Sequence, residues 1–195
     1  MFEGLRRNYY AAILADCPWS FEAWSDKGKD RSAENHYNVM SLADIKALPV
    51  GELAADDCVL FLWAIDPMLP QALDVGKAWG FKFKTVAFYW AKTGAKLPHF
   101  WQQSDENFPL GSGYWTRANP EQCLLFTRGR PKRINRDVRK LIIAPRREHS
   151  RKPDDVMDGI ERLVDGPRLE LFARQRRSNW DCWGDDVDKF KEAAE

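Results

Sequence analysis

Apolar runs of strand length alternate with helix-type patterns along this chain. Runs this short and this apolar are typical of strands that are buried in a sheet. The predicted strands are residues 10–15, 58–64, 83–90, 121–127, 141–144, 169–173 and 180–183. Between them, apolar positions at helical spacing predict helices. This alternation indicates an α/β fold with a mostly parallel sheet and helices on both faces.

Polar residues, prolines and glycines mark the ends of the predicted helices. Ser41 is the expected N-cap of a short helix that Pro49 ends. A second helix is expected to begin at Pro67 and to end at Gly80. A third is expected to begin at Pro153.

The 195 residues are enough for one domain with a substantial core. We expect a single domain over residues 1–195, with its core at 9–186 and a short C-terminal tail at 187–195, in which residues 189–195 form a solvated segment or the end of a helix. Two stretches without periodicity, 21–35 and 93–117, predict loops with a functional role. No apolar stretch is long enough to span a bilayer or to act as a signal peptide. The sequence therefore predicts no membrane partner and a cytoplasmic location.

The cysteines and histidines do not have the spacing of a metal site. Cys17, Cys58, Cys123 and Cys182 contain no C-x-x-C pair, and the three histidines do not supply the missing ligands. Three of the four cysteines lie in apolar strand-like runs, where buried free thiols are expected. The sequence therefore predicts neither a metal nor a disulfide.

Positive charge is concentrated in one segment, although the formal net charge is only +1. Residues 128–152 contain eleven lysines and arginines and two acids, so the remainder of the chain is acidic. One basic segment on an otherwise acidic protein indicates a polyanionic partner such as nucleic acid.

The candidate chemistry lies at Asp16-Cys17-Pro18-Trp19, directly after the first predicted strand. Open α/β sheets bind their ligands at the carboxyl ends of the strands. A carboxylate, a backbone carbonyl and an aromatic ring at that position can hold a planar amine. The same four residues can also form an ordinary proline turn with a buried tryptophan. Motifs for dinucleotides, for a P-loop or for a nucleophile elbow are missing from the sequence, so hydrolase chemistry fits poorly.

The tetrapeptide resembles the Asp-Pro-Pro-Trp signature of adenine-N6 methyltransferases. More specifically, it is similar to the MT-A family, named after the catalytic subunit of the eukaryotic messenger-RNA adenosine methyltransferase. The resemblance extends over about residues 9–186 and rests on further blocks. They are His36-Tyr37, Leu60 to Trp63, Trp79 to Phe81, Trp90 to Lys92, Gly111 to Arg117, Glu121, Arg147 to Asp154, Leu169 to Arg174 and Trp180 to Gly184.

The resemblance implies a Rossmann-like methyltransferase fold with permuted motif order and S-adenosylmethionine as cofactor, with no metal. It implies methyl transfer to the N6 amine of adenine in nucleic acid, and in a duplex that base must first leave the stack. The Asp16 carboxylate and the Cys17 carbonyl would accept the two amine hydrogens. Pro18 would fix the turn, and Trp19 would pack against the base. Catalysis would then consist of positioning and electrostatics.

Further residues carry over from the same resemblance. Lys152 would bind the carboxylate of the cofactor, and Arg174 with Asn179 would bind its ribose. Asp185 and Asp186 stand where the family often has amides that contact the cofactor's adenine. Around the substrate nucleotide, the resemblance implies His36, Tyr37, Arg117, Glu121, Arg147 and His149.

The sequence departs from the family at Cys17, which replaces the first proline of the signature. The carbonyl acceptor is kept, but the turn loses rigidity. Two alternatives stay open: a cytosine methyltransferase with a Cys17 nucleophile, and a catalytically silent nucleic-acid-binding subunit. DNA is favoured over RNA because the chain carries none of the appended segments of the eukaryotic enzymes. The target sequence and the oligomeric state are left open.

Overall fold

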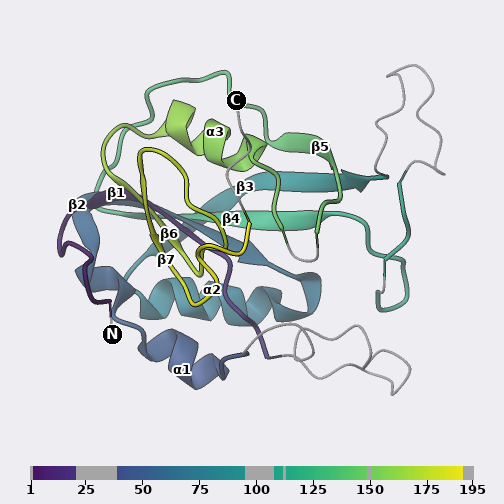
Figure 1. Ribbon diagram of the computed structural model, residues 1–195, viewed down its shortest axis with the longest axis horizontal. Coiled ribbons are helices and arrows are strands. Elements are labelled where there is room, and N and C mark those ends of the chain that lie inside the picture. Colours follow the sequence, from purple (N-terminus) through teal and green to yellow (C-terminus); the bar gives the residue numbers. More distant parts are fainter. Residues whose placement is uncertain (1, 21–38, 95–107, 112, 149–150, 191–195) are drawn as a thin grey trace.

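The computed structural model describes residues 2–20, 39–94, 108–111, 113–148 and 151–190. The strands form a seven-stranded sheet in the order β5-β3-β4-β2-β1-β6-β7 (Figure 1). They are β1 (Tyr10–Ala15), β2 (Ala54–Ala64), β3 (Lys82–Thr93), β4 (Glu121–Arg128), β5 (Leu141–Pro145), β6 (Arg168–Leu171) and β7 (Trp180–Trp183). β4 runs antiparallel to its neighbours β2 and β3, and the other described pairs are parallel. The prediction of a mostly parallel sheet is confirmed.

Helices cover both faces of the sheet, as the sequence predicts (Figure 1). They are α1 (Leu42–Ala47), α2 (Leu69–Ala78) and α3 (Asp155–Leu163), with 3-10 turns η3 (Val50–Glu52) and η4 (Asp66–Met68). α1 and α2 lie on one face, and α3 lies on the other. Each face has its own buried core. Ile13 and Leu14 of β1 belong to opposite cores because successive side chains of a strand point to opposite faces.

Among the predicted helix ends, Ser41 and Gly80 agree with the structure and Pro67 differs. The hydroxyl of Ser41 accepts a hydrogen bond from the backbone N–H of Asp44 at 3.1 Å, which confirms the N-cap. Gly80 follows the end of α2 with φ +87°, a conformation that favours glycine. Pro67 lies in η4, and the α-helix proper begins only at Leu69.

Three strands differ from the prediction by more than one residue at an end, and β4 and β5 are each one residue longer than predicted. β2 begins at Ala54 because that residue pairs with Tyr10 of β1. β3 runs on to Thr93 because β5 continues to pair with it there. β6 ends at Leu171, since Phe172 has φ +61° and a left-handed residue cannot continue a strand.

Other sequence expectations can be placed on this fold. Cys17, Cys58 and Cys123 are buried and Cys182 is half-buried, all as free thiols. Nowhere in the described residues are three His, Cys, Asp or Glu side chains grouped to hold a metal ion. Of the helices that the structure describes, none has the length and apolar character to cross a membrane. The predicted loop at 21–35, and residues 95–107 of the predicted loop at 93–117, lie outside the described residues.

Candidate active site

β1 brings Asp16 to the carboxyl edge of the sheet, on the face that α3 covers. Leu14 belongs to the α3-side core, and Ala15 belongs to the opposite core. Because side chains alternate along an extended chain, Asp16 emerges on the same side as Leu14. β2 and β6 flank β1 in parallel and end at the same edge. Asp16 therefore lies where sheets of this kind bind ligands.

Lys152, just before α3, joins Asp16 to a second carboxylate. Its Nζ donates a hydrogen bond to Oδ2 of Asp16 at 2.7 Å and lies 3.4 Å from Oε2 of Glu121. It also lies 5.3 Å from the centre of the Trp63 ring, within range of a cation–π contact. Burial alone would lower the pKa of Lys152, but the two carboxylates outweigh it and raise that pKa. Lys152 is therefore a fixed positive charge at neutral pH.

Lys92 balances the charge of Glu121 from the other side. Its Nζ donates to Oε1 of Glu121 at 2.5 Å. Both side chains face α3, because Glu121 pairs with Trp90 and Lys92 lies two residues beyond Trp90 on β3. Burial would raise the pKa of Glu121, but the two lysines outweigh it and lower that pKa. The result is a chain of alternating charges that runs Lys92, Glu121, Lys152, Asp16.

Arg147 holds the backbone that carries Lys152. Its guanidinium donates to both carboxylate oxygens of Asp154, at 2.7 and 3.0 Å, and to the carbonyl oxygen of Lys152. Asp154 also accepts a hydrogen bond from Gln175 at 3.2 Å. Burial would raise the pKa of Asp154, but the hydrogen bond from Arg147 and its charge lower it. Arg147 thus supports the site from behind, and its contact with substrate stays a prediction.

Glu170 is a half-buried acid without a hydrogen-bond partner among the described residues. It lies on β6 directly beside Leu14 of β1, so its side chain points to the same α3 face. Its Oε2 is buried and accepts no hydrogen bond from any described group. Burial, and then the charges of Asp16 and Asp154, raise the pKa of Glu170 to about 7. A cationic ligand group beside this carboxyl would stabilise its ionised form.

A cavity opens next to these groups at the carboxyl edge. Its lining includes Asp16, Trp63, Lys152, Glu170, Phe172 and Arg174. Aromatic walls and charges of both signs are therefore available to one ligand. Such a mixture suits a zwitterionic molecule with an apolar or aromatic part.

Phe190 also lines the cavity, although the sequence placed it in a solvated tail. Its backbone N–H donates to the carbonyl of Arg174 at 2.9 Å. The guanidinium of Arg151 lies 5.0 Å from the centre of its ring. Phe190 is thus half-buried beside Arg151 and Arg174, and residues 191–195 of the predicted tail lie outside the described residues.

Cys17 and Trp19 face away from Asp16. Both belong to the α1–α2 core, with only 3% and 6% of their surface exposed. The turn is fixed from both sides, since the Trp19 N–H donates to the Cys17 carbonyl at 2.9 Å and the Met40 N–H donates to the Pro18 carbonyl at 3.0 Å. The Trp19 ring thus packs into the core, and its contact with the base stays a prediction.

The Cys17 thiol is also unsuited to act as a nucleophile. Burial, and then the charge of Asp16, raise its pKa well above the ordinary value. The thiolate is the reactive form of cysteine, so this environment keeps Cys17 inert. The cytosine-methyltransferase alternative therefore loses its nucleophile.

The predicted cofactor residues that follow β6 are divided between the two edges of the sheet. Asp185 and Asp186 follow β7 at the carboxyl edge. The pKa of Asp186 is lowered, first by a hydrogen bond from Lys189 and then by the charges of Lys189 and Arg174. Asn179 has φ +64° and directly precedes β7, so the structure does not bring it to the cavity.

The predicted substrate residues are only partly assembled. Glu121 lies in the charged chain beside Asp16. Arg117 is exposed and makes no hydrogen bond or ion pair within the part of the chain that the structure describes. The remaining predicted residues lie outside that part; they are His36, Tyr37 and His149.

Two residues of the site are missed by sequence reasoning. Glu170 could have been found, since it is an acid between Leu169 and Leu171 in a predicted buried strand. A charge in a buried strand costs free energy unless it is compensated, so it indicates a functional site. Lys92 lies beyond the predicted end of its strand at Trp90. The face of the sheet on which its side chain lies follows only from the continuation of β3 to Thr93.

Comparison with known proteins agrees with this geometry. The MT-A70 family profile matches residues 10–186. The chain is 32% identical over 202 residues to the Type II methyltransferase M.MunI of Mycoplasma sp, a match that covers 94% of this chain and 80% of that protein. It is also 32% identical to the N(6)-adenosine-methyltransferase MT-A70-like protein of Drosophila melanogaster over 187 residues. To the human N(6)-adenosine-methyltransferase catalytic subunit METTL3 it is 28% identical over 184 residues.

These matches differ in how much of each relative they cover. The chain spans 28% of the length of the Drosophila protein and 28% of the human one, with 93% and 92% of its own residues in the matches. The profile match extends from the first residue of β1 to beyond β7, and so includes Asp16, Lys152 and Glu170. The chain belongs to the MT-A70 family.

Proposed function

We propose that this protein transfers a methyl group from S-adenosylmethionine to the exocyclic N6 amine of adenine in nucleic acid. The placement of Asp16 carries the proposal: it stands at the carboxyl edge, oriented by Lys152, beside a cavity with charges of both signs. The names of the fly and human relatives support the same reaction. We favour DNA as substrate because the Type II methyltransferase M.MunI, at 32% identity, is more similar to this chain than the human adenosine-methyltransferase is, at 28%.

The cavity residues fit the charged end of S-adenosylmethionine. The Lys152 ammonium would bind the carboxylate of the cofactor. The unpartnered Oε2 of Glu170, together with Asp16, offers carboxylates to its cationic amino and sulfonium groups. Arg174, which lines the cavity, is the proposed ribose contact. Asp186, whose pKa reflects the charge of Arg174, is with Asp185 the proposed contact to the cofactor's adenine.

Asp16 and Cys17 can accept the two hydrogens of the adenine amine. Oδ2 of Asp16 is held by Lys152, while Oδ1 has no hydrogen-bond partner among the described residues. The Cys17 carbonyl accepts one hydrogen bond from Trp19, and a carbonyl oxygen has a second lone pair. The lone pair of the amine is delocalised into the purine, so the amine alone is a weak nucleophile. Two acceptors localise that pair on nitrogen and direct it.

When bound, S-adenosylmethionine supplies an electrophilic methyl group on a positively charged sulfur. Methylation of the amine leaves one proton to be removed. Oδ1 of Asp16 already accepts an amine hydrogen, so it takes this proton and releases it to solvent. Lys152 stays charged throughout, because the carboxylates of Asp16 and Glu121 stabilise its ammonium, and it keeps the Asp16 carboxylate in one orientation.

The proposal is tested by incubating the protein with methyl-labelled S-adenosylmethionine and defined DNA and RNA oligonucleotides, followed by nucleoside analysis. We expect labelled N6-methyladenine, at a higher rate on DNA. Labelled N6-methyladenine in RNA but not in DNA would overturn the choice of DNA as substrate and would still support methyl transfer to the N6 amine. Labelled cytosine, or no labelled nucleoside on any substrate, would contradict the proposal.

A further inference from the structure

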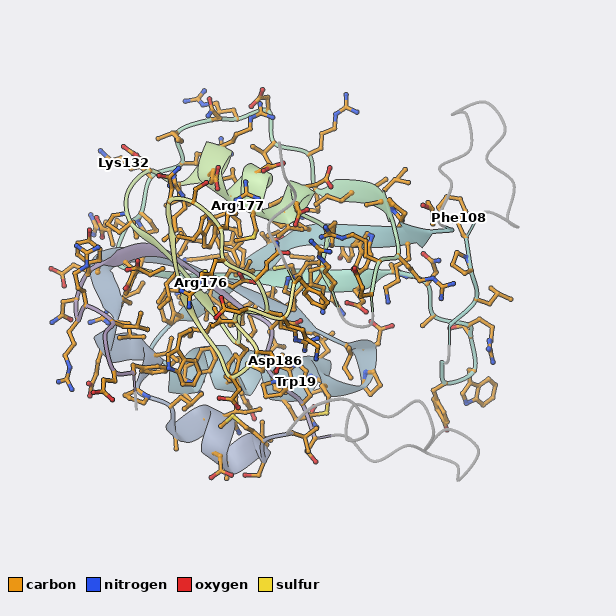
Figure 2. All side chains as sticks on the ribbon, viewed as in Figure 1. Trp19, Phe108, Lys132, Arg176, Arg177 and Asp186 are labelled. Atoms are coloured by element: carbon orange, nitrogen blue, oxygen red, sulfur yellow. The ribbon has the colours of Figure 1, made fainter. Side chains whose placement is uncertain are left out.

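The basic segment 128–152 does not form one surface. Its last basic residues lie at the carboxyl edge, where Arg147, Arg151 and Lys152 each pair with a carboxylate. Its first part connects β4 to β5 at the opposite edge, because β4 is antiparallel and ends there. Figure 1 shows this connection passing along α3, and Figure 2 shows Lys132 far from Trp19 and Asp186.

Six exposed basic side chains lie on this connection, and together they are called the far basic surface. They are Arg130, Lys132, Arg133, Arg136, Arg139 and Lys140. Asp137 is the acid that lies among them in sequence, and its carboxylate is bonded to Arg162 at 2.5 Å. Within the described residues, none of the six forms an ion pair. Their charge is therefore open to a partner.

The connection is fixed to the folded core. The N–H of Ile134 donates to the carbonyl of Leu163 at the end of α3, at 2.9 Å. The N–H of Arg130 donates to Oδ1 of Asp57 at 2.7 Å. Val138 packs into the α3-side core. The basic side chains thus extend from an ordered backbone, which reduces the entropy lost when they bind.

The far basic surface is remote from Asp16. The eight residues of β4 separate Glu121, in the charged chain, from Arg128, where the connection begins. At about 3.3 Å per residue this is about 23 Å, or about seven steps of a nucleic-acid duplex. A nucleotide held at Asp16 and its immediate neighbours therefore do not reach the far basic surface, whereas a longer nucleic acid can.

We propose that the far basic surface binds the phosphate backbone of the nucleic-acid substrate, away from the target adenine. Arginine and lysine contacts to phosphates give affinity without sequence preference. Such contacts keep a long substrate on the protein while the carboxyl edge engages successive adenines. That the polyanion is the substrate rests on the proposed function, whereas the binding of phosphates does not.

The test compares two variants that each lack two positive charges. In the first, Arg133→Gln and Arg136→Gln remove charge from the far basic surface. In the matched control, Lys46→Gln and Lys77→Gln remove charge from α1 and α2. Each is measured by fluorescence anisotropy with a hairpin-closed duplex of about 4 base pairs, which is too short to span the separation, and with one of about 40 base pairs, over a range of salt concentrations. Thermal unfolding checks that both variants remain folded.

The first variant should bind the long duplex at least about tenfold more weakly at 0.1 M salt, with a log–log salt slope smaller by about 2. Its affinity for the short duplex, and both affinities of the control, should stay at the wild-type values. An unchanged long-duplex affinity, or an equal loss on both duplexes, would overturn the inference. Long single-stranded DNA and RNA probes should show the same loss, since the phosphate backbone is common to them.

Methylation of the short duplex, assayed in parallel, separates the two proposals. If the wild-type protein methylates it and the first variant also binds long duplexes normally, only the far basic surface is refuted. If no methylation occurs on any of the DNA and RNA substrates but the length-dependent loss is seen, the phosphate contact stands and the proposed reaction fails.

Discussion

The unpartnered carboxyl of Glu170 makes the stability of the fold depend on pH, and one substitution should remove that dependence. Its pKa of about 7 in the folded protein lies above the ordinary 4.5. The folded state therefore binds more protons at this group than the unfolded state does between these values. The stabilisation is fully present below about pH 4.5 and is lost as the pH rises through about 7.

The size of the effect follows from the two pKa values. The difference between about 7 and 4.5 corresponds to about 3 kcal/mol of unfolding free energy. Because the side chain is partly reached by solvent, we expect about 2 kcal/mol. Glu170→Gln keeps the shape of the protonated acid and cannot ionise. It should therefore match the wild type at pH 5 and be more stable by about 2 kcal/mol at pH 8.

Urea unfolding, followed by tryptophan fluorescence at pH 5, 6.5 and 8, measures this difference. Glu52→Gln serves as a control, because Glu52 is exposed and pairs with Arg7 at the surface. A difference between wild type and Glu170→Gln that is the same at pH 5 and pH 8 would refute the argument. A less stable variant at pH 8 would show instead that the ionised carboxylate has a stabilising partner.

Three further substitutions address neighbouring parts of the site. Lys152→Met should weaken the binding of S-adenosylhomocysteine, measured by calorimetry, by about tenfold to a hundredfold, because one charge-assisted hydrogen bond is lost. An unchanged affinity would exclude Lys152 as the ligand of the cofactor's carboxylate. Cys17→Ser should keep at least about half of the methylation rate, because its buried thiol is not a nucleophile, and complete loss would restore the cysteine mechanism. Trp19→Leu should lower the unfolding free energy by about 2–4 kcal/mol in urea titrations, whereas a loss below about 1 kcal/mol would contradict its place in the core.

The part of the site that follows directly from local sequence could be predicted. Asp16 comes after an apolar run, and a buried strand delivers whatever follows it to the edge of the sheet. Ser41 likewise marks the start of α1 because its hydroxyl can satisfy a free N–H. In both cases the signal and its consequence lie within a few residues of each other.

The rest of the site depends on strand order and register. Glu170 faces the cavity because β6 pairs with β1, and the chain between them is more than a hundred residues long. The two halves of the basic segment separate because β4 is antiparallel and the next strand, β5, lies on the far side of β3. The burial of Trp19 depends on the α1–α2 core that packs around it, which involves residues far from it in sequence.

The central claim is that the Asp16 carboxylate positions the adenine amine for methyl transfer. It is tested most directly by the rate of N6-methyladenine formation on DNA by Asp16→Asn, at saturating S-adenosylmethionine and with cofactor binding measured separately. Asparagine keeps the size of the side chain but removes the charge that accepts the amine hydrogen and the proton. We predict that this rate falls by at least about a hundredfold. Methylation by Asp16→Asn at the wild-type rate would contradict the account.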